Sequence, residues 1–362
     1  MIVPRTCGLG ARSSALRIWS RAIQERTVRH RIISTKAPAA PARAATAKAT
    51  ARAPVTAPTA ATALQGSQLG LSKAKSLNVP LKLLPISVPG RAGIAIQTFF
   101  VDTPAGVSEV ADRLWAQAPG SGLYADLEGT RLSRHGLLSL LILYSPLARQ
   151  AFLLDIFTLK SAAFKTKGLR GFSIKQILQS NDYKKAFFDV RNDSDALFHQ
   201  FGVALRNVED IQLMENATRP YGPSRNHLHG LAKCLEIVLS SAEKKEWAKS
   251  KDAGKALFCP ESGGSYAVFN KRPQSPEIMA YCVGDVYYLP RLREKHWKKL
   301  SKIWRKRVME ESKARVLQSQ QKDYEPHSSK KSKSPWVDES SRAASCRPNG
   351  ISIVKWNLSL GN

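Results

Sequence analysis

The chain has 362 residues, 43% of them apolar, and it carries a formal net charge of +28 at pH 7. This length allows one large domain with tails or two small domains, and the apolar share is enough for a sizeable core. Five scattered cysteines without C-x-x-C spacing argue against a disulfide framework or a cysteine-based zinc site. The longest apolar run, residues 137–144, is too short to cross a bilayer. We therefore expect a soluble protein without membrane insertion, whose charge favours polyanionic partners, nucleic acid first.

The amino-terminal quarter is unlike the rest of the chain. In residues 1–34 Leu16, Trp19 and Ile23 recur at helical spacing among arginines, with almost no acid. This composition is typical of a mitochondrial presequence, although a basic tail of a nuclear or cytoplasmic protein would share it. Residues 35–93 are mostly Ala, Pro, Thr and Lys, and they lack the large apolar side chains of a core. They predict a disordered linker.

From residue 94 onward, strand and helix patterns alternate. Strands are expected at residues 95–101 (an edge strand), 123–128, 136–144, 151–156, 186–190 and 208–214. Helices are expected at residues 107–118, 173–180, 193–201, 228–239 and 242–251, with one or two more over 275–308, interrupted at Pro290. The near-continuous Leu and Ile of the middle strands indicate burial on both faces. This is the pattern of an α/β domain with a mixed sheet, followed at residues 309–362 by a basic and largely disordered tail.

Two carboxylates stand at the end of the central strand. Asp126 and Glu128 are two residues apart, so in a strand both side chains point to the same face. Adjacent carboxylates repel one another unless a cation lies between them, and Mg²⁺ and Mn²⁺ prefer oxygen ligands. An isolated Asp-x-Glu pair more often marks a solvated strand end. The pair therefore predicts a metal site only if the chain supplies further acids nearby.

Such acids occur later in the chain. Asp193 stands at the start of a helix that directly follows a buried strand, where Asn192 or Asp193 could cap the helix. Tyr281 and Asp285 are four residues apart, which puts both side chains on one helical face. Residues at the carboxyl ends of strands and on adjoining helices can converge although they are distant in sequence.

The ordered set Asp126-x-Glu128, Asp193 and Tyr281-x-x-x-Asp285 resembles the 3′–5′ exonucleases of the ribonuclease D type. These form the tyrosine-bearing branch of a superfamily named for its four acids, which includes the Werner-syndrome exonuclease domain. The resemblance covers roughly residues 94–300 and leaves both tails aside. It implies a ribonuclease H-like fold over residues 94–308, with a five-stranded mixed sheet flanked by helices and further helices at the carboxyl end.

The resemblance also implies an activity, which is metal-dependent removal of nucleotides from a single-stranded 3′ end. Two Mg²⁺ or Mn²⁺ ions would serve as cofactors, with Asp126 shared between them. Glu128 and Asp285 would complete the first ion site and Asp193 would support the second. Tyr281 would orient the attacking water beside Glu128.

Two alternatives stay open at this stage. Counting back without gaps from Phe201-Gly202 selects Asp193 as the second-motif acid, whereas the Ser194-Asp195 pair resembles other family members. A catalytically inactive nucleic-acid-binding adaptor with the same fold is the alternative function. The retained acids and Tyr281 argue against it, and both RNA and DNA are candidate substrates.

Overall fold

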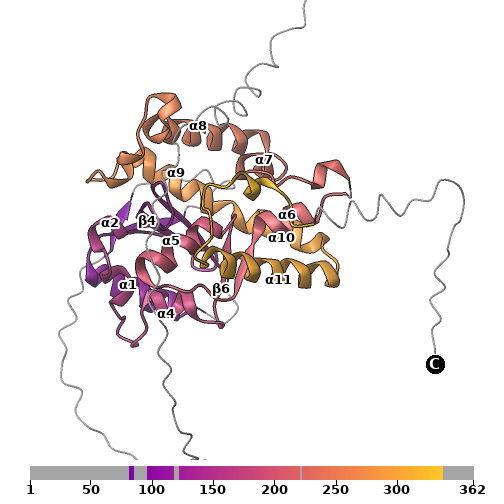
Figure 1. Ribbon diagram of the computed structural model, residues 1–362. Coiled ribbons are helices and arrows are strands. Elements are labelled where there is room, and N and C mark those ends of the chain that lie inside the picture. Colours follow the sequence, from indigo (N-terminus) through magenta and orange to yellow (C-terminus); the bar gives the residue numbers. More distant parts are fainter. Residues whose placement is uncertain (1–80, 85–95, 118–121, 221, 337–362) are drawn as a thin grey trace, which may run out of the picture. The chain divides into compact units, whose positions relative to one another are not determined.

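The computed structural model describes residues 81–84, 96–117, 122–220 and 222–336 (Figure 1). The expected presequence at 1–34 lies outside the described residues, so the mitochondrial localisation stays a prediction. No helix within the described ranges is both long and apolar enough to cross a membrane. Within the same ranges Cys234, Cys259 and Cys282 are free thiols.

A seven-stranded mixed sheet forms the centre of the fold. Its strand order is β1 (Lys82–Leu84), β2 (Gln97–Val101), β5 (Gln150–Asp155), β4 (Leu137–Ser145), β3 (Gly122–Thr130), β6 (Lys184–Phe187) and β7 (Val208–Asp210). Strands β3, β4 and β5 pair antiparallel, and β6 and β7 continue from β3 in parallel. On the other side, β2 runs parallel to β5, and β1 runs antiparallel to β2. The expected α/β class is confirmed, and β3 lies inside the sheet, between the middle strand β4 and β6.

The sheet is wider than the expected five strands. The strands β5, β4, β3, β6 and β7 make up that five-stranded unit, and β2 and β1 extend it. Strand β2 is therefore not the edge, because Lys82–Leu84 pairs along its outer side. The sheet thus begins before the predicted boundary at residue 94. A three-residue strand between prolines is too short to produce a periodic signal in the sequence.

Helices cover both faces of the sheet. The α-helices are α1 (Pro104–Trp115), α2 (Ile156–Leu159), α3 (Ala162–Lys165), α4 (Ile174–Gln179), α5 (Arg191–Phe201), α6 (Ile211–Ala217), α7 (Leu231–Leu235), α8 (Ser241–Phe258), α9 (Pro276–Tyr287), α10 (Leu289–Lys299) and α11 (Lys302–Ser319). Short 3₁₀ helices lie at Pro223–Arg225, Pro260–Ser262, Tyr266–Asn270 and Ser329–Ser332. Figure 1 shows α1 and α4 on one side of the sheet and α8 and α9 on the other.

Successive side chains of β4 point to opposite faces of the sheet and pack into two hydrophobic cores. Leu141 and Leu143 pack with α1 and α4, whereas Leu140 and Ile142 pack with α9. All four leucine and isoleucine side chains are fully buried. The apolar run at residues 137–144 is thus part of a strand buried on both faces, as is usual in parallel and mixed sheets.

Several element boundaries differ from the sequence-based prediction. The last strand ends at Asp210 rather than residue 214, because the Asp210 side chain accepts a hydrogen bond from the Gln212 backbone and starts α6. Helix α5 begins at Arg191 without a side-chain cap, so neither Asn192 nor Asp193 caps it. Helix α7 is shorter than expected, and α8 continues to Phe258.

The carboxyl-terminal boundary at residue 308 is too early. Helix α11 continues to Ser319, and residues 320–336 return along the domain. There the Leu228 backbone donates to Ser332 and the Ser334 backbone donates to Asn226, at 2.8 and 2.9 Å. Trp336, at the end of this segment, is buried. We call residues 320–336 the return segment.

Candidate active site

Three of the predicted acids converge at one side of the sheet. Asp126 and Glu128 project from β3 toward α9, which carries Asp285, and one ligand oxygen from each lies within 4.8 Å of the others. A bulge between Glu128 and Gly129 ends the regular pairing of β3 with β4. A side chain at Gly129 would meet the Leu137 carbonyl oxygen at 1.9 Å, so only glycine fits after Glu128. We call these three acids the acid triad.

Tyr281 lies one helical turn before Asp285 on α9. Its hydroxyl hydrogen-bonds the Glu128 carboxylate, and its ring packs edge-on against Phe258 with 5.0 Å between ring centroids. Helix α8 approaches Tyr281 closely, because a Cβ at Gly254 would lie 2.6 Å from the Tyr281 Cβ. The i,i+4 spacing of Tyr281 and Asp285 therefore does bring both side chains to the triad, as the sequence predicted.

Two carboxyls of the triad, Asp126 and Glu128, have raised pKa values. Burial, then repulsion from Asp285, raises the pKa of Asp126 to about 7, against the opposing charge of Lys251. Burial and repulsion from Asp126 and Asp285 raise the pKa of Glu128 well above its ordinary value. Carboxylates packed in this way are stabilised in their ionised form by nearby cations and by hydrogen-bond donors such as the Tyr281 hydroxyl.

One cation already lies among these acids. The Lys251 ammonium of α8 is 2.5 Å from Asp285 Oδ2 and 4.0 Å from the centroid of the Tyr281 ring. Its side chain is only 13% exposed. The sequence did not single out this residue, because Lys251 is one of several lysines on α8 and its acidic partner lies on another helix.

The triad fits a hard divalent cation. It offers carboxylate oxygens only, the donor type preferred by Mg²⁺ and Mn²⁺. Asp285 Oδ1 is buried and has no hydrogen-bond partner among the described residues. A buried carboxylate oxygen without a partner costs free energy, and coordination to an ion would satisfy it.

The second-motif acids Asp193 and Asp195 have different surroundings. Asp193 is buried outside the triad, and burial followed by repulsion from Asp126 raises its pKa well above the ordinary value. Asp195 is fully buried against Arg134, which donates to it from both its backbone and its side chain at 2.7 Å. Asp193 is thus within electrostatic reach of Asp126 and Glu128, whereas Asp195 binds the backbone and side chain of Arg134.

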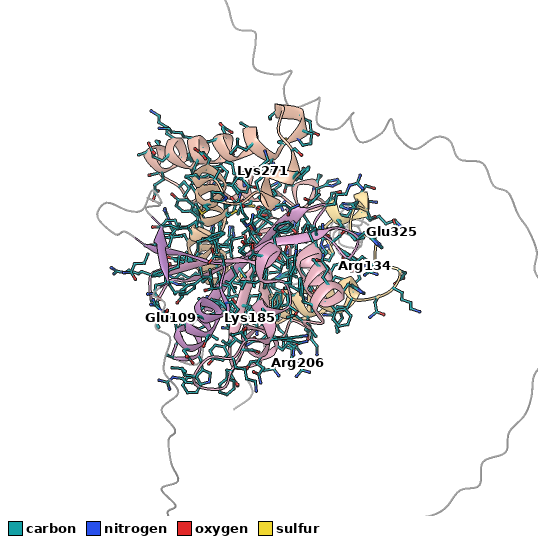
Figure 2. The ribbon with its side chains drawn as sticks, turned by 90° about the vertical axis from the view of Figure 1, so that its left-hand side faces the viewer. Glu109, Arg134, Lys185, Arg206, Lys271 and Glu325 are labelled. Atoms are coloured by element: carbon teal, nitrogen blue, oxygen red, sulfur yellow. The ribbon has the colours of Figure 1, made fainter. Side chains whose placement is uncertain are left out.

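The return segment reaches the helix that carries Asp193. Tyr324 and Lys331 both donate to the Asn192 side-chain oxygen, at 2.9 and 2.5 Å. The Arg134 guanidinium, which binds Asp195, also donates to the Ser319 and Gln321 carbonyls. In Figure 2 Arg134 and Glu325 lie on the same side of the domain.

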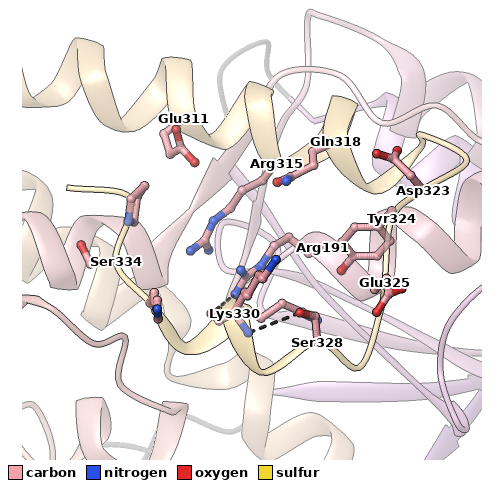
Figure 3. A pocket seen from close by; sticks show the side chains of 13 residues that line it. Arg191, Glu311, Arg315, Gln318, Asp323, Tyr324, Glu325, Ser328, Lys330 and Ser334 are labelled. Carbon is pink, nitrogen blue, oxygen red and sulfur yellow. Dashed lines mark hydrogen bonds between the residues drawn. The ribbon is translucent and has the colours of Figure 1, made fainter. Parts of the chain in front are cut away.

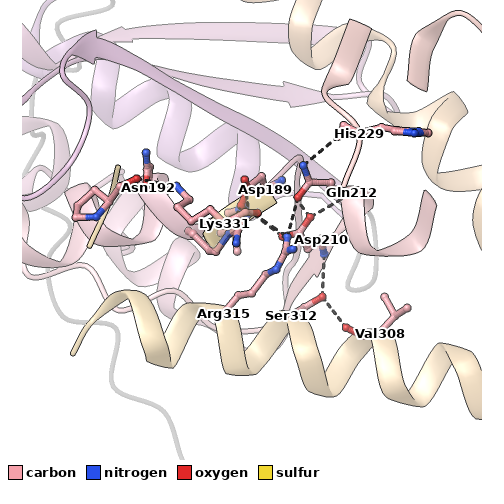
Figure 4. A network of polar contacts seen from close by, with 12 residues as sticks. Asp189, Asn192, Asp210, Gln212, His229, Val308, Ser312, Arg315 and Lys331 are labelled. Atoms are coloured by element: carbon pink, nitrogen blue, oxygen red, sulfur yellow. Dashed lines mark hydrogen bonds and ion pairs between the residues drawn. The ribbon is translucent and has the colours of Figure 1, made fainter. Parts of the chain in front are cut away.

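A buried ion network joins the return segment to the sheet. Arg191 binds Asp189 and the Lys331 carbonyl. Arg315 of α11 binds Asp210 at 2.7 Å (Figure 4). A cavity of about 630 Å³ lies between α11 and the return segment (Figure 3), where Arg191 and Arg315 line one wall. The two guanidiniums are paired with internal acids, so this network fastens the return segment to the base of α5.

Glu215, His229 and Cys234 form a second compact group of possible ligands. Here Arg219 binds Glu215 at 2.8 Å and lies 3.3 Å from His229 Nε2. Its positive charge opposes a cation at the same atoms. Burial also raises the pKa of Cys234 to about 12, which disfavours the thiolate that a metal needs. This group is a polar cluster of the fold.

A sequence model described as a 3′–5′ exonuclease matches residues 99–301, more than half of the chain. The chain belongs to the 3′–5′ exonuclease family. This exonuclease domain contains β3, α5 and α9, and therefore every acid predicted from the sequence. Helix α11 and the return segment follow the matched residues.

Known proteins share parts of this exonuclease domain. The chain is 35% identical over 88 residues to the mouse piRNA biogenesis protein EXD1, a stretch that covers 24% of this chain and 14% of the mouse protein. Trypanosoma brucei RNase D in complex with GMP superposes with a TM-score of 0.54 at 21% identity, covering 66% of this chain and 69% of that chain. The same trypanosomal protein in complex with RNA U12 gives 0.52 at 20% identity, covering 67% and 78%. These structures show the shared fold.

Proposed function

We propose that the protein is a metal-dependent 3′–5′ exonuclease that hydrolyses phosphodiester bonds at nucleic-acid 3′ ends. The observation that carries the proposal is the acid triad, in which Asp126, Glu128 and Asp285 lie within 4.8 Å of one another. A protein gains no stability from three carboxylates at this spacing unless a cation binds them. Family membership supplies the reaction type.

Each residue of the site has its own role in this proposal. When bound, two divalent ions would activate a water and stabilise the leaving oxygen. In this proposal Asp126 would be shared between the ions, Glu128 and Asp285 would complete the first site, and Asp193 would support the second. The Tyr281 hydroxyl, held by Glu128, orients the attacking water. Burial raises the pKa of Tyr281, so the phenol keeps its proton and acts as a hydrogen-bond donor.

The proposed substrate is a single-stranded 3′ end of RNA or DNA. The net charge of +28 supports a polyanionic substrate, since phosphates release counterions when Lys and Arg approach them. The crystals of trypanosomal RNase D with RNA U12 show RNA bound by a protein of this fold. Discrimination between RNA and DNA would require a contact to the 2′-hydroxyl.

A cleavage assay tests the proposal. Purified protein is incubated with oligonucleotides labelled at the 5′ end, as matched RNA and DNA strands, with Mn²⁺ or with EDTA. We expect a ladder of progressively shorter labelled products with Mn²⁺ only, and none from an Asp126→Asn variant that is otherwise folded. Oligonucleotide binding without cleavage in any metal would instead identify the inactive adaptor.

A further inference from the structure

Lys251 and a metal ion would interact with the same carboxylate, that of Asp285. The Lys251 ammonium hydrogen-bonds Asp285 Oδ2, and its charge also acts on Asp126 and Glu128. It therefore neutralises part of the negative charge of the triad. A divalent ion held by the same three carboxylates would lie within a few ångströms of this ammonium, where like charges repel strongly in a partly buried site. The Lys251 ammonium therefore opposes the binding of a divalent ion to the triad.

The lysine side chain can move while its helix stays in place. Gly254 packs against Tyr281 without room for a Cβ, so α8 is fixed on α9 one turn after Lys251. The lysine stem has four flexible carbons and ends near the rings of Tyr281 and Trp247, at 4.0 and 5.8 Å. Rotation of this stem moves the ammonium away from the acids without moving the backbone.

We propose that Lys251 occupies the metal position in the metal-free protein and is displaced when a divalent ion binds. Lys251 is then a competing internal cation that keeps the acid triad compact and sets a threshold concentration for metal binding. This inference rests on the metal site of the proposed function. It adds a residue of α8 that no acid motif contains, and it predicts that Lys251 lowers the affinity of the site for metal.

Calorimetry of Mn²⁺ binding distinguishes a Lys251 that competes with the metal from a Lys251 that supports metal binding. Mn²⁺ is titrated at pH 8 into the wild type, Lys251→Met and Lys249→Met. Lys249 is the matched control because it is an exposed lysine on the same helix. We expect Lys251→Met to bind Mn²⁺ about tenfold more tightly than the wild type, because one charged hydrogen bond contributes about this factor. Lys249→Met should bind Mn²⁺ as the wild type does.

Equal or weaker Mn²⁺ binding by Lys251→Met, with tight binding by the wild type, would overturn the inference and leave the exonuclease proposal standing. Failure of all three proteins to bind Mn²⁺ would overturn the metal site and the inference with it. Because Lys251→Met leaves Asp285 without its partner, a second measurement uses the unaltered protein.

The second measurement is brief acetylation of lysines, read out by mass spectrometry. In the metal-free protein the Lys251 amine is bound to Asp285 and reacts slowly. Saturating Mn²⁺ should raise acetylation of Lys251 several-fold and leave Lys249 unchanged. Unchanged or reduced acetylation of Lys251 in the presence of bound Mn²⁺ would contradict displacement.

Discussion

Asp193 and Asp195 are two positions apart on α5, and each has a different physical task. Asp193 is repelled by Asp126 and by Asp189, so its charge costs free energy in the metal-free fold. Asp195 is paired with Arg134 in the interior, where the loss of one partner leaves the other buried and uncompensated. The same substitution should therefore have opposite effects on stability at the two positions.

Alanine variants of the two residues test this difference. We predict that Asp193→Ala abolishes metal-dependent cleavage while the protein stays at least as resistant to urea as the wild type. Asp195→Ala should lower the free energy of unfolding by roughly 3 kcal/mol, because Arg134 loses its buried partner. An active Asp193→Ala beside a stable but inactive Asp195→Ala would assign the second-motif role to Asp195 instead.

Asp126 makes the stability of the metal-free protein depend on pH. Its folded-state pKa of about 7 is above the ordinary 3.8, so the unfolded chain loses this proton first as the pH rises. The contribution of Asp126 to stability is fully present below pH 3.8 and is lost as the pH rises through about 7.

In EDTA, Asp126→Asn should therefore be more stable than the wild type at pH 8. The gain should be on the order of 1–2 kcal/mol, after allowance for the partial exposure of this carboxyl, and it should shrink toward pH 5. Urea denaturation of both proteins across this pH range measures it. A difference that is constant with pH, or that grows toward acid, would contradict the raised pKa.

Sequence spacing was sufficient to find most residues of the site. Asp126 and Glu128 share a strand face and Tyr281 and Asp285 share a helix face, and in both cases local periodicity fixes the direction of the side chains. Lys251 could not be found in this way. Its partner Asp285 is 34 positions later, and only the packing of α8 on α9 brings the two together.

At the level of elements, the carboxyl-terminal helix and return segment show where sequence patterns fail. The buried face of α11 includes Ser312, Arg315 and Ser319 as well as Val308. Ser312 donates to the Val308 carbonyl and accepts from the Asp210 backbone, and Arg315 binds Asp210. A helix whose buried face is polar has no apolar stripe, so the sequence resembles a solvated tail.

Trp336 tests whether the return segment contributes to the fold. Its ring packs against Trp304 with 5.3 Å between ring centroids, beside Leu213 and Met214 of α6. We predict that Trp336→Ala lowers the free energy of unfolding by roughly 3 kcal/mol, as expected for a buried aromatic side chain. The exposed Lys333 is the control, and Lys333→Ala should change stability by less than about 0.5 kcal/mol. Equal urea midpoints for Trp336→Ala and the wild type would show that residues 320–336 do not stabilise the domain.

At the level of the whole molecule, the α/β class and the core strands could be predicted, and the width of the sheet could not. Strands β3, β4 and β5 contain short apolar runs of the kind that predicts buried strands. Strand β1 has three residues, and its pairing with β2 depends on contacts across the sheet. The family match ends at residue 301, before α11 and the return segment. Tyr324 and Lys331 of the return segment bind Asn192 beside Asp193, so this segment contacts the helix that carries part of the candidate site.

The central claim is that acids from β3 and α9 hold a divalent ion at the site of cleavage. Anomalous diffraction from a crystal of the protein soaked in Mn²⁺ tests it most directly. We predict an anomalous peak bound by Asp126, Glu128 and Asp285 at about 2.1 Å from their oxygens, with the Lys251 ammonium moved away. A crystal saturated with Mn²⁺ that shows no peak at these three carboxylates, or shows one only elsewhere, would contradict the account.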